Sequence, residues 1–247
     1  MKRTLTLVFA LLWFPICVEA QAKACSTRMK TIRGCPVTGC GGSQMDQNLN
    51  RRKNIRSDDH AIVPRTLQWI KDRPNPQHFV KGGSRTELFV LGEGAHIRVT
   101  GFMLIARSGN PESCNCGARL TQQRDLDNHL VLVEEDTLNT EGANEAKTLA
   151  LREKKSITAE FTPRVRLDHP NLVRANLVSR ISNAPRKALL VRVTGLLMFD
   201  SEHFIGLHLV RINNWEIHPV LKLEFCETGN DCTADNDAGW KSLDDLP

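Results

Sequence analysis

The chain has 247 residues, with 33 Lys and Arg against 28 Asp and Glu, so its formal net charge is +5. Hydrophobic residues make up 40% and charged residues 25%, a globular composition that excludes wholesale disorder and a fibrous repeat. Eight Cys and the absence of Tyr are the two unusual counts.

The first twenty residues have the pattern of a secretory signal peptide. A short basic start is followed by the mostly apolar run Thr4–Val18 and by a Val-Glu-Ala string that ends at Ala20. The run contains Pro15 and is shorter than the roughly 20 residues that a membrane-spanning helix needs. We therefore predict cleavage after Ala20, a periplasmic or secreted location, and no membrane span.

The cysteine count is best interpreted after this cleavage. Loss of two basic residues and one acidic residue lowers the net charge from +5 to +4, and loss of Cys17 leaves seven cysteines, Cys25 among them. Export favours disulfides, and an odd count leaves at least one thiol without a partner in the same chain. The candidates for disulfide bonds are Cys35, Cys40, Cys114, Cys116, Cys226 and Cys232.

Spacing suggests how these cysteines pair. Cys226 and Cys232 could close a small loop, and Cys35 and Cys40 flank another one. Cys114 and Cys116 are too close in sequence to pair easily, so each could reach a distant partner in the N-terminal segment. A zinc site of Cys35, Cys40, Cys114 and Cys116 is the alternative, because C-x4-C and C-x-C loosely match structural zinc spacing.

The two ends of the chain differ in charge. Residues 21–84 are interpreted as a basic, Cys-containing N-terminal extension with short helices near Gln44–Lys53 and Pro64–Lys71. Residues 227–247 form an acidic C-terminal tail. Both ends are expected to be solvated, or to lie against each other through their opposite charges.

Residues 85–226 carry the pattern of a β domain. Strands are predicted over Ala95–Arg107, Asn128–Glu134, Ser156–Leu167, Ala188–Asp200 and Trp215–Cys226. A helix capped by Asp168 is predicted between the third and fourth strands, and residues 137–155 are interpreted as a solvated or partly helical insertion. This order is that of an OB-fold, so we predict a mainly β fold with an OB-like five-stranded barrel. Another small β-sandwich or barrel is the alternative.

A short internal repeat supports the barrel. The string Arg-Val-Thr-Gly occurs at Arg98–Gly101 and again at Arg192–Gly195, inside two predicted strands. Glycine within a strand often marks a bulge or a sharp bend, and a small barrel needs both to close.

Three strings resemble a group of exported bacterial proteins of uncharacterised function. They are Cys35–Cys40, Glu112–Cys116 and especially the Trp-Glu-Ile-His-Pro-Val string at Trp215–Val220. The resemblance covers most of the chain after the signal peptide. It implies a bacterial origin and export, but it implies no activity and no functional residue.

A cluster of His and carboxylate residues is the first candidate site. Asp200 and His203 follow the fourth strand, while Glu216 and His218 share one face of the fifth, opposite Trp215 and the other core residues. Asp127 and His129 could join them. Such groups can bind a divalent metal or act as acid and base, as in a nuclease-like metal-dependent hydrolase. The alternative is that they are solvated strand ends and that His218 only binds backbone.

The second candidate is a ligand face. OB-folds commonly bind oligonucleotides or oligosaccharides on strands two and three, flanked by the first and fourth loops, here residues 108–127 and 201–214. The candidate ligand-binding residues are Arg119, Arg124, Phe161, Arg164, Arg166 and Arg211. Sparse aromatics and a modest charge weaken the case for nucleic acid, which binds by stacking as well as by charge.

These observations favour an exported, non-catalytic binding protein of the bacterial cell envelope. Its ligand would be an oligosaccharide, a nucleic acid or a protein partner, and the metal-dependent hydrolase is the alternative. No cofactor and no metal are expected in the leading interpretation. The sequence contains no Gly-rich phosphate loop, nucleophile elbow or His-Glu-x-x-His string.

Overall fold

The computed structural model describes Cys25 and residues 31–117, 126–203, 210–227, 232–234 and 236–245. The predicted signal peptide lies outside these residues. No helix in the described ranges is long and apolar enough to cross a membrane.

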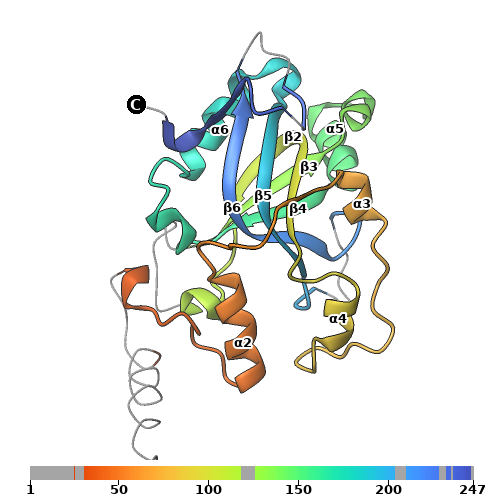
Figure 1. Ribbon diagram of the computed structural model, residues 1–247. Coiled ribbons are helices and arrows are strands. Elements are labelled where there is room, and N and C mark those ends of the chain that lie inside the picture. Colours follow the sequence, from red (N-terminus) through yellow and green to blue (C-terminus); the bar gives the residue numbers. More distant parts are fainter. Residues whose placement is uncertain are drawn as a thin grey trace, which may run out of the picture.

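Five strands form a closed barrel, as predicted (Figure 1). They are β2 (His96–Ser108), β3 (Asn128–Val133), β4 (Ile157–Phe161), β5 (Leu189–Phe199) and β6 (Trp215–Cys226). Their order around the barrel is β2-β3-β4-β6-β5, and β5 pairs with β2 to close the ring. Only the β4–β6 pair is parallel among these strands. With helix α6 (Arg174–Asn183) between β4 and β5, the topology is that of an OB-fold.

The repeated Arg-Val-Thr-Gly strings lie side by side in the closing pair of strands. Arg98 stands opposite Thr194, Val99 opposite Val193, and Thr100 opposite Arg192. The pairing of β5 with β6 shifts register on both sides of Gly195, which is the bulge expected there. Gly101 differs, because the irregularity in β2 lies between Met103 and Ile105. Gly101 instead gives room for Leu67, whose Cδ1 would lie 2.5 Å from an added Cβ.

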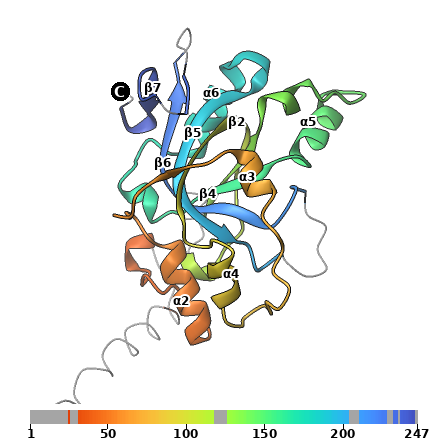
Figure 2. The same ribbon diagram turned by 45° about the vertical axis from the view of Figure 1, so that its right-hand side comes forward.

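The N-terminal segment packs on the barrel. Helix α2 (Gln44–Lys53) has the predicted bounds and begins with a capping box of Ser43 and Asp46. Helix α3 (Leu67–Lys71) is shorter than predicted because Thr66 caps it. The strand β1 (Val63–Pro64) pairs with β2, and Leu67 and Ile70 enter the barrel core. Helix α4 (Thr86–Val90) follows (Figure 2).

The C-terminal segment is also more than a solvated tail. Strand β7 (Trp240–Ser242) pairs with β6, and the next residue, Leu243, is buried in the main core. The 3-10 turn η8 (Leu243–Asp245) ends the described chain. In the 137–155 region, the 3-10 turn η5 (Glu135–Asn139) and helix α5 (Glu145–Glu153) confirm the partly helical interpretation.

The connection from β4 to α6 differs from the prediction. Strand β4 ends at Phe161, because Thr162 Oγ1 accepts a hydrogen bond from the Val165 amide and starts the 3-10 turn η6 (Val165–Leu167). Asp168 caps no helix, since α6 begins only at Arg174; its carboxylate forms an ion pair with Arg56 instead. The last short turn before β5 is η7 (Pro185–Lys187).

Three disulfides join six of the seven described cysteines. Cys226–Cys232 closes the predicted small loop, whereas Cys40 pairs with Cys25 and Cys35 pairs with Cys116. The Cys35–Cys116 bridge ties the N-terminal segment to the turn η2 (Ser113–Asn115), as expected for Cys116. The prediction of a disulfide at Cys114 is wrong, because this residue is buried and unbridged. The four-cysteine zinc site is therefore wrong, since three of its members form disulfides.

Candidate metal centre

The strands β3, β4 and β6 carry a polar patch on the outer face of the barrel. Leu130, Ala159 and Ile217 belong to the interior core, so the alternate residues face the other way. These outward residues are His129, Glu160, Glu216 and His218. Three of them are nevertheless buried, with Glu160 4%, Glu216 2% and His218 0% exposed. A second layer of chain must therefore cover this face.

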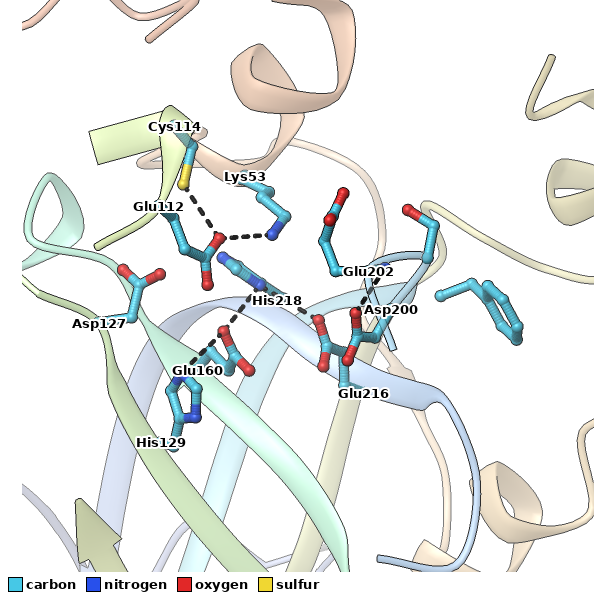
Figure 3. A network of polar contacts seen from close by, with 12 residues as sticks. Lys53, Glu112, Cys114, Asp127, His129, Glu160, Asp200, Glu202, Glu216 and His218 are labelled. Carbon is cyan, nitrogen blue, oxygen red and sulfur yellow. Dashed lines mark hydrogen bonds and ion pairs between the residues drawn. The ribbon is translucent and has the colours of Figure 1, made fainter. Parts of the chain in front are cut away.

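The covering layer is the end of α2 together with the loop around η2 (Figure 3). Asn54, which caps α2, donates a hydrogen bond of 2.8 Å to the Cys114 carbonyl and so holds η2 in place. Lys53 Nζ donates to Glu112 Oε2 at 2.7 Å, and the Cys114 thiol lies 3.4 Å from the same oxygen. Asp127, directly before β3, accepts a hydrogen bond of 2.9 Å from Asn115.

We call this set of seven residues the polar centre. Its members are Lys53, Glu112, Cys114, Asp127, His129, Glu160 and His218. His218 Nδ1 lies 3.1 Å from Glu160 Oε2, and His129 Nε2 lies 3.4 Å from the same oxygen. Glu160 is thus the carboxylate that β4 places between two imidazoles.

Three overlapping groups in the polar centre have metal-ligand geometry. They are Glu112–Cys114–Asp127, Glu112–His129–Glu160 and Asp127–Glu160–His218. Within each group the ligand atoms lie within 4.8 Å of one another. Ligands of one ion at about 2.0–2.3 Å are separated by up to about twice that distance, so each group could hold a cation after small adjustments.

Three buried atoms in the polar centre have no hydrogen-bond partner. His129 Nε2 lies 3.4 Å from Glu160 Oε2, whereas Asp127 Oδ2 and His218 Nε2 belong to residues that are 0% exposed. A buried polar atom without a partner costs free energy, typically about 1–3 kcal/mol in proteins. A ligand that accepts electron pairs from Asp127 Oδ2 and His218 Nε2 would remove that cost.

The charges of the centre also shift its protonation. Burial, followed by the charge of Glu112, raises the pKa of Asp127 to about 7. Burial alone would lower the pKa of His218, but the neighbouring Glu160 and Glu216 carboxylates outweigh it and raise that pKa to about 10. Burial opposes ionisation of Glu160 too, yet the nearby histidines hold its pKa below the usual range. At neutral pH, His218 is therefore protonated and Asp127 is partly protonated. A metal ion bound by these two side chains would displace their protons.

The predicted cluster of Asp200, His203, Glu216 and His218 is one connected network. His203 Nδ1 lies 2.6 Å from Asp200 Oδ2, Arg211 pairs with both Asp200 and Glu216, and Glu216 Oε1 lies 3.3 Å from His218 Nδ1. The network therefore runs into the polar centre through His218. Asp200 and Glu216 share the Arg211 guanidinium and flank the centre, and neither belongs to a metal-ligand group of the described residues.

The predicted ligand-binding residues do not form an exposed face. Phe161 is 0% exposed, and Arg164 donates a hydrogen bond to the Cys35 carbonyl at 2.6 Å. Arg166 donates to the carbonyl groups of Phe161 and Leu126. Arg211 is held by its two carboxylates. These four side chains thus stabilise the fold, and Arg119 and Arg124 lie outside the described residues.

Sequence reasoning found part of this centre and missed the rest. Asp127, His129 and His218 were among the expected residues, whereas Glu112, Glu160 and Lys53 were not, and Cys114 was expected in a disulfide. The sequence could have indicated Glu160, because this carboxylate stands in a short strand between two core residues, Ala159 and Phe161. No comparable signal marks Lys53, which reaches the centre only through the packing of α2.

Comparisons with known proteins add no assignment. No family model matches the chain, and no curated protein or solved structure shows significant similarity to it.

Proposed function

We propose that this protein is an exported metal-dependent hydrolase whose metal centre lies on the outer face of β3, β4 and β6. The observation that carries the proposal is the Asp127–Glu160–His218 group, in which two fully buried side chains, Asp127 and His218, each have a polar atom without a hydrogen-bond partner. Two carboxylates and one imidazole form a ligand set suited to Zn²⁺, Mn²⁺ or a similar divalent ion.

The position of the centre supports a functional role. It includes residues of β3 and β4, the two strands that form the ligand face of OB-folds, together with His218 of β6, and residues of the first loop complete it. The side chains of Glu112 and His129 are each 26% exposed, while Lys53 is 11% exposed, so solvent reaches the centre from the Glu112 and His129 side. A divalent ion with carboxylate and imidazole ligands can activate water for hydrolysis of a phosphoester or another ester.

The charge balance of the centre also favours a bound cation. Glu112, Asp127 and Glu160 bring three carboxylates together, and Lys53 is the one permanently cationic side chain that contacts any of them among the described residues. A divalent cation would compensate the remaining negative charge. A surface for nucleic acid alone would need the opposite sign.

Metal uptake tests the proposal directly. We expect the oxidised wild-type protein to retain Zn²⁺ or Mn²⁺ after dialysis, as measured by inductively coupled plasma mass spectrometry. In Asp127→Asn the side chain keeps its shape and its oxygen can still accept the hydrogen bond from Asn115, but its charge is removed. We therefore expect the affinity for the metal ion to fall at least tenfold. His60→Ala, at an exposed histidine, is the control.

Hydrolytic activity is measured with single-stranded DNA and with a chromogenic phosphodiester as substrates, in the presence of the added metal ion. Activity that disappears in Asp127→Asn and persists in His60→Ala would support it. A wild-type protein that takes up no divalent ion would contradict the metal centre. Metal uptake without turnover of any ester substrate would contradict the hydrolase.

A second candidate function, non-catalytic binding of an envelope polymer, has one observation in its favour. A groove of about 1070 Å³ lies beside α6 and β5, away from the polar centre, and is lined by Phe102, Phe225, Arg180 and several amide side chains. Amide groups suit an oligosaccharide, whereas Phe225 is buried and Arg180 lies over its ring. Binding to an oligosaccharide array that Ser179→Trp abolishes would support this function, and no binding by wild type would exclude it for the sugars tested.

A further inference from the structure

We propose that the polar centre holds two divalent ions, and that Cys114 is the sulfur ligand of the second. This inference rests on the proposed metal centre and extends it. The first ion takes the Asp127–Glu160–His218 group, and the second takes the Glu112–Cys114–Asp127 group. Asp127 is common to both.

The composition of the three ligand groups is the main argument. Each group contains two carboxylates and one nitrogen or sulfur donor, and each pair of groups shares one carboxylate. The shared residues are Glu112, Asp127 and Glu160, the side chains that have two oxygen atoms and can bridge two ions. The terminal donors, Cys114, His129 and His218, are each used once. Carboxylate bridges between ions about 3.5–4 Å apart are typical of two-metal centres.

A single ion does not account for Cys114. No group of described residues that meets the distance criterion contains both Cys114 and His218. An ion bound by His218 therefore leaves the thiol unused, and an ion bound by Cys114 leaves His218 Nε2 without a partner. Two ions satisfy both donors.

The chemical state of Cys114 fits a ligand role. It is 0% exposed and unbridged, although Cys116, two residues away, forms a disulfide. Its Sγ atom lies 3.4 Å from Glu112 Oε2. On binding, the metal ion displaces the thiol proton to solvent, and a metal–sulfur bond forms with no change of oxidation state.

Titration of the oxidised full-length protein with Co²⁺ tests the inference. We expect two equivalents to bind and a sulfur-to-cobalt charge-transfer band to appear in the near ultraviolet. In Cys114→Ser we expect the band to vanish and one equivalent to remain. Asp127→Asn should weaken both sites at least tenfold, because it removes the shared ligand.

The outcomes separate this inference from the proposed function. One equivalent in wild type without a charge-transfer band would overturn the second ion and leave the metal centre standing. Two equivalents without the band would overturn the role of Cys114. No Co²⁺ uptake would overturn both. The titration of the wild-type protein alone distinguishes these outcomes, so the test holds even if a variant fails to fold.

Discussion

Arg211 lies between two buried carboxylates, and its pairing with Asp200 stabilises the loop beside the polar centre. Its side chain and that of Asp200 are each 9% exposed. Burial opposes the ionisation of Asp200, but the His203 hydrogen bond and the Arg211 charge outweigh burial and lower its pKa from 3.8 to about 2. Removing one partner of an ion pair so well shielded from water leaves a buried charge uncompensated, which costs more than breaking a surface pair.

This shift predicts a pH dependence of folding stability. Because the folded-state pKa lies below the unfolded value, the contribution of Asp200 is present above about pH 4 and is lost as the pH falls toward about 2. The shift corresponds to about 2 kcal/mol. We expect Asp200→Asn to be less stable than wild type at pH 6, by urea denaturation, and the difference to shrink between about pH 4 and 2. Asp59→Asn, at an exposed position, is the control. A difference that is constant over this range would contradict the assignment.

Strands β5 and β6 approach each other closely at Gly195. An added Cβ would lie 2.4 Å from the Pro219 carbonyl oxygen and 3.0 Å from Val220 Cα, both backbone atoms. At Gly101, the nearest atom is the end of the flexible Leu67 side chain. The two glycines of the repeat therefore have different roles, one in strand pairing and one in packing against α3.

Alanine substitution should distinguish these roles. We expect Gly195→Ala to lower the free energy of unfolding by about 1–3 kcal/mol, because the backbone of β6 must move. Gly101→Ala should cost less, because Leu67 can change rotamer, and Gly42→Ala should be near neutral because nothing lies within 4 Å of its Cβ position. Chemical denaturation of the three variants measures this order. A larger loss for Gly101→Ala than for Gly195→Ala would contradict it.

The strand β6 shows why the barrel could be predicted and the centre only in part. Its predicted bounds, Trp215–Cys226, match the structure, because alternating apolar residues define a strand from local sequence alone. The same alternation placed Glu216 and His218 together on one face. Their contacts with Glu160 and the position of Lys53 depend on the order of strands and on how α2 packs, which no local pattern contains.

At the scale of the whole molecule, the disulfides differ in the length of chain that they close. Cys35–Cys116 joins residues 81 apart, whereas Cys226–Cys232 joins residues six apart. The entropy that a bridge removes from the unfolded chain grows with loop length. The long bridge should therefore contribute more to the stability of the fold.

Paired serine variants test this difference. Loss of the long bridge in Cys35→Ser/Cys116→Ser should cost about 4–5 kcal/mol, and loss of the short one in Cys226→Ser/Cys232→Ser about 2 kcal/mol. Urea denaturation of the two double variants provides the comparison, and each serves as the control for the other. An equal loss, or a larger one for the short bridge, would contradict this account.

The Cys35–Cys116 bridge also has a consequence for when the centre can assemble. It anchors the turn that supplies Glu112 and Cys114 to the same segment that supplies Lys53. While the chain is reduced, only noncovalent packing would hold these parts together. For the proposed exported protein, oxidation would act as a maturation step: a newly made chain in a reducing cytosol would lack this anchor and would gain it on reaching an oxidising compartment.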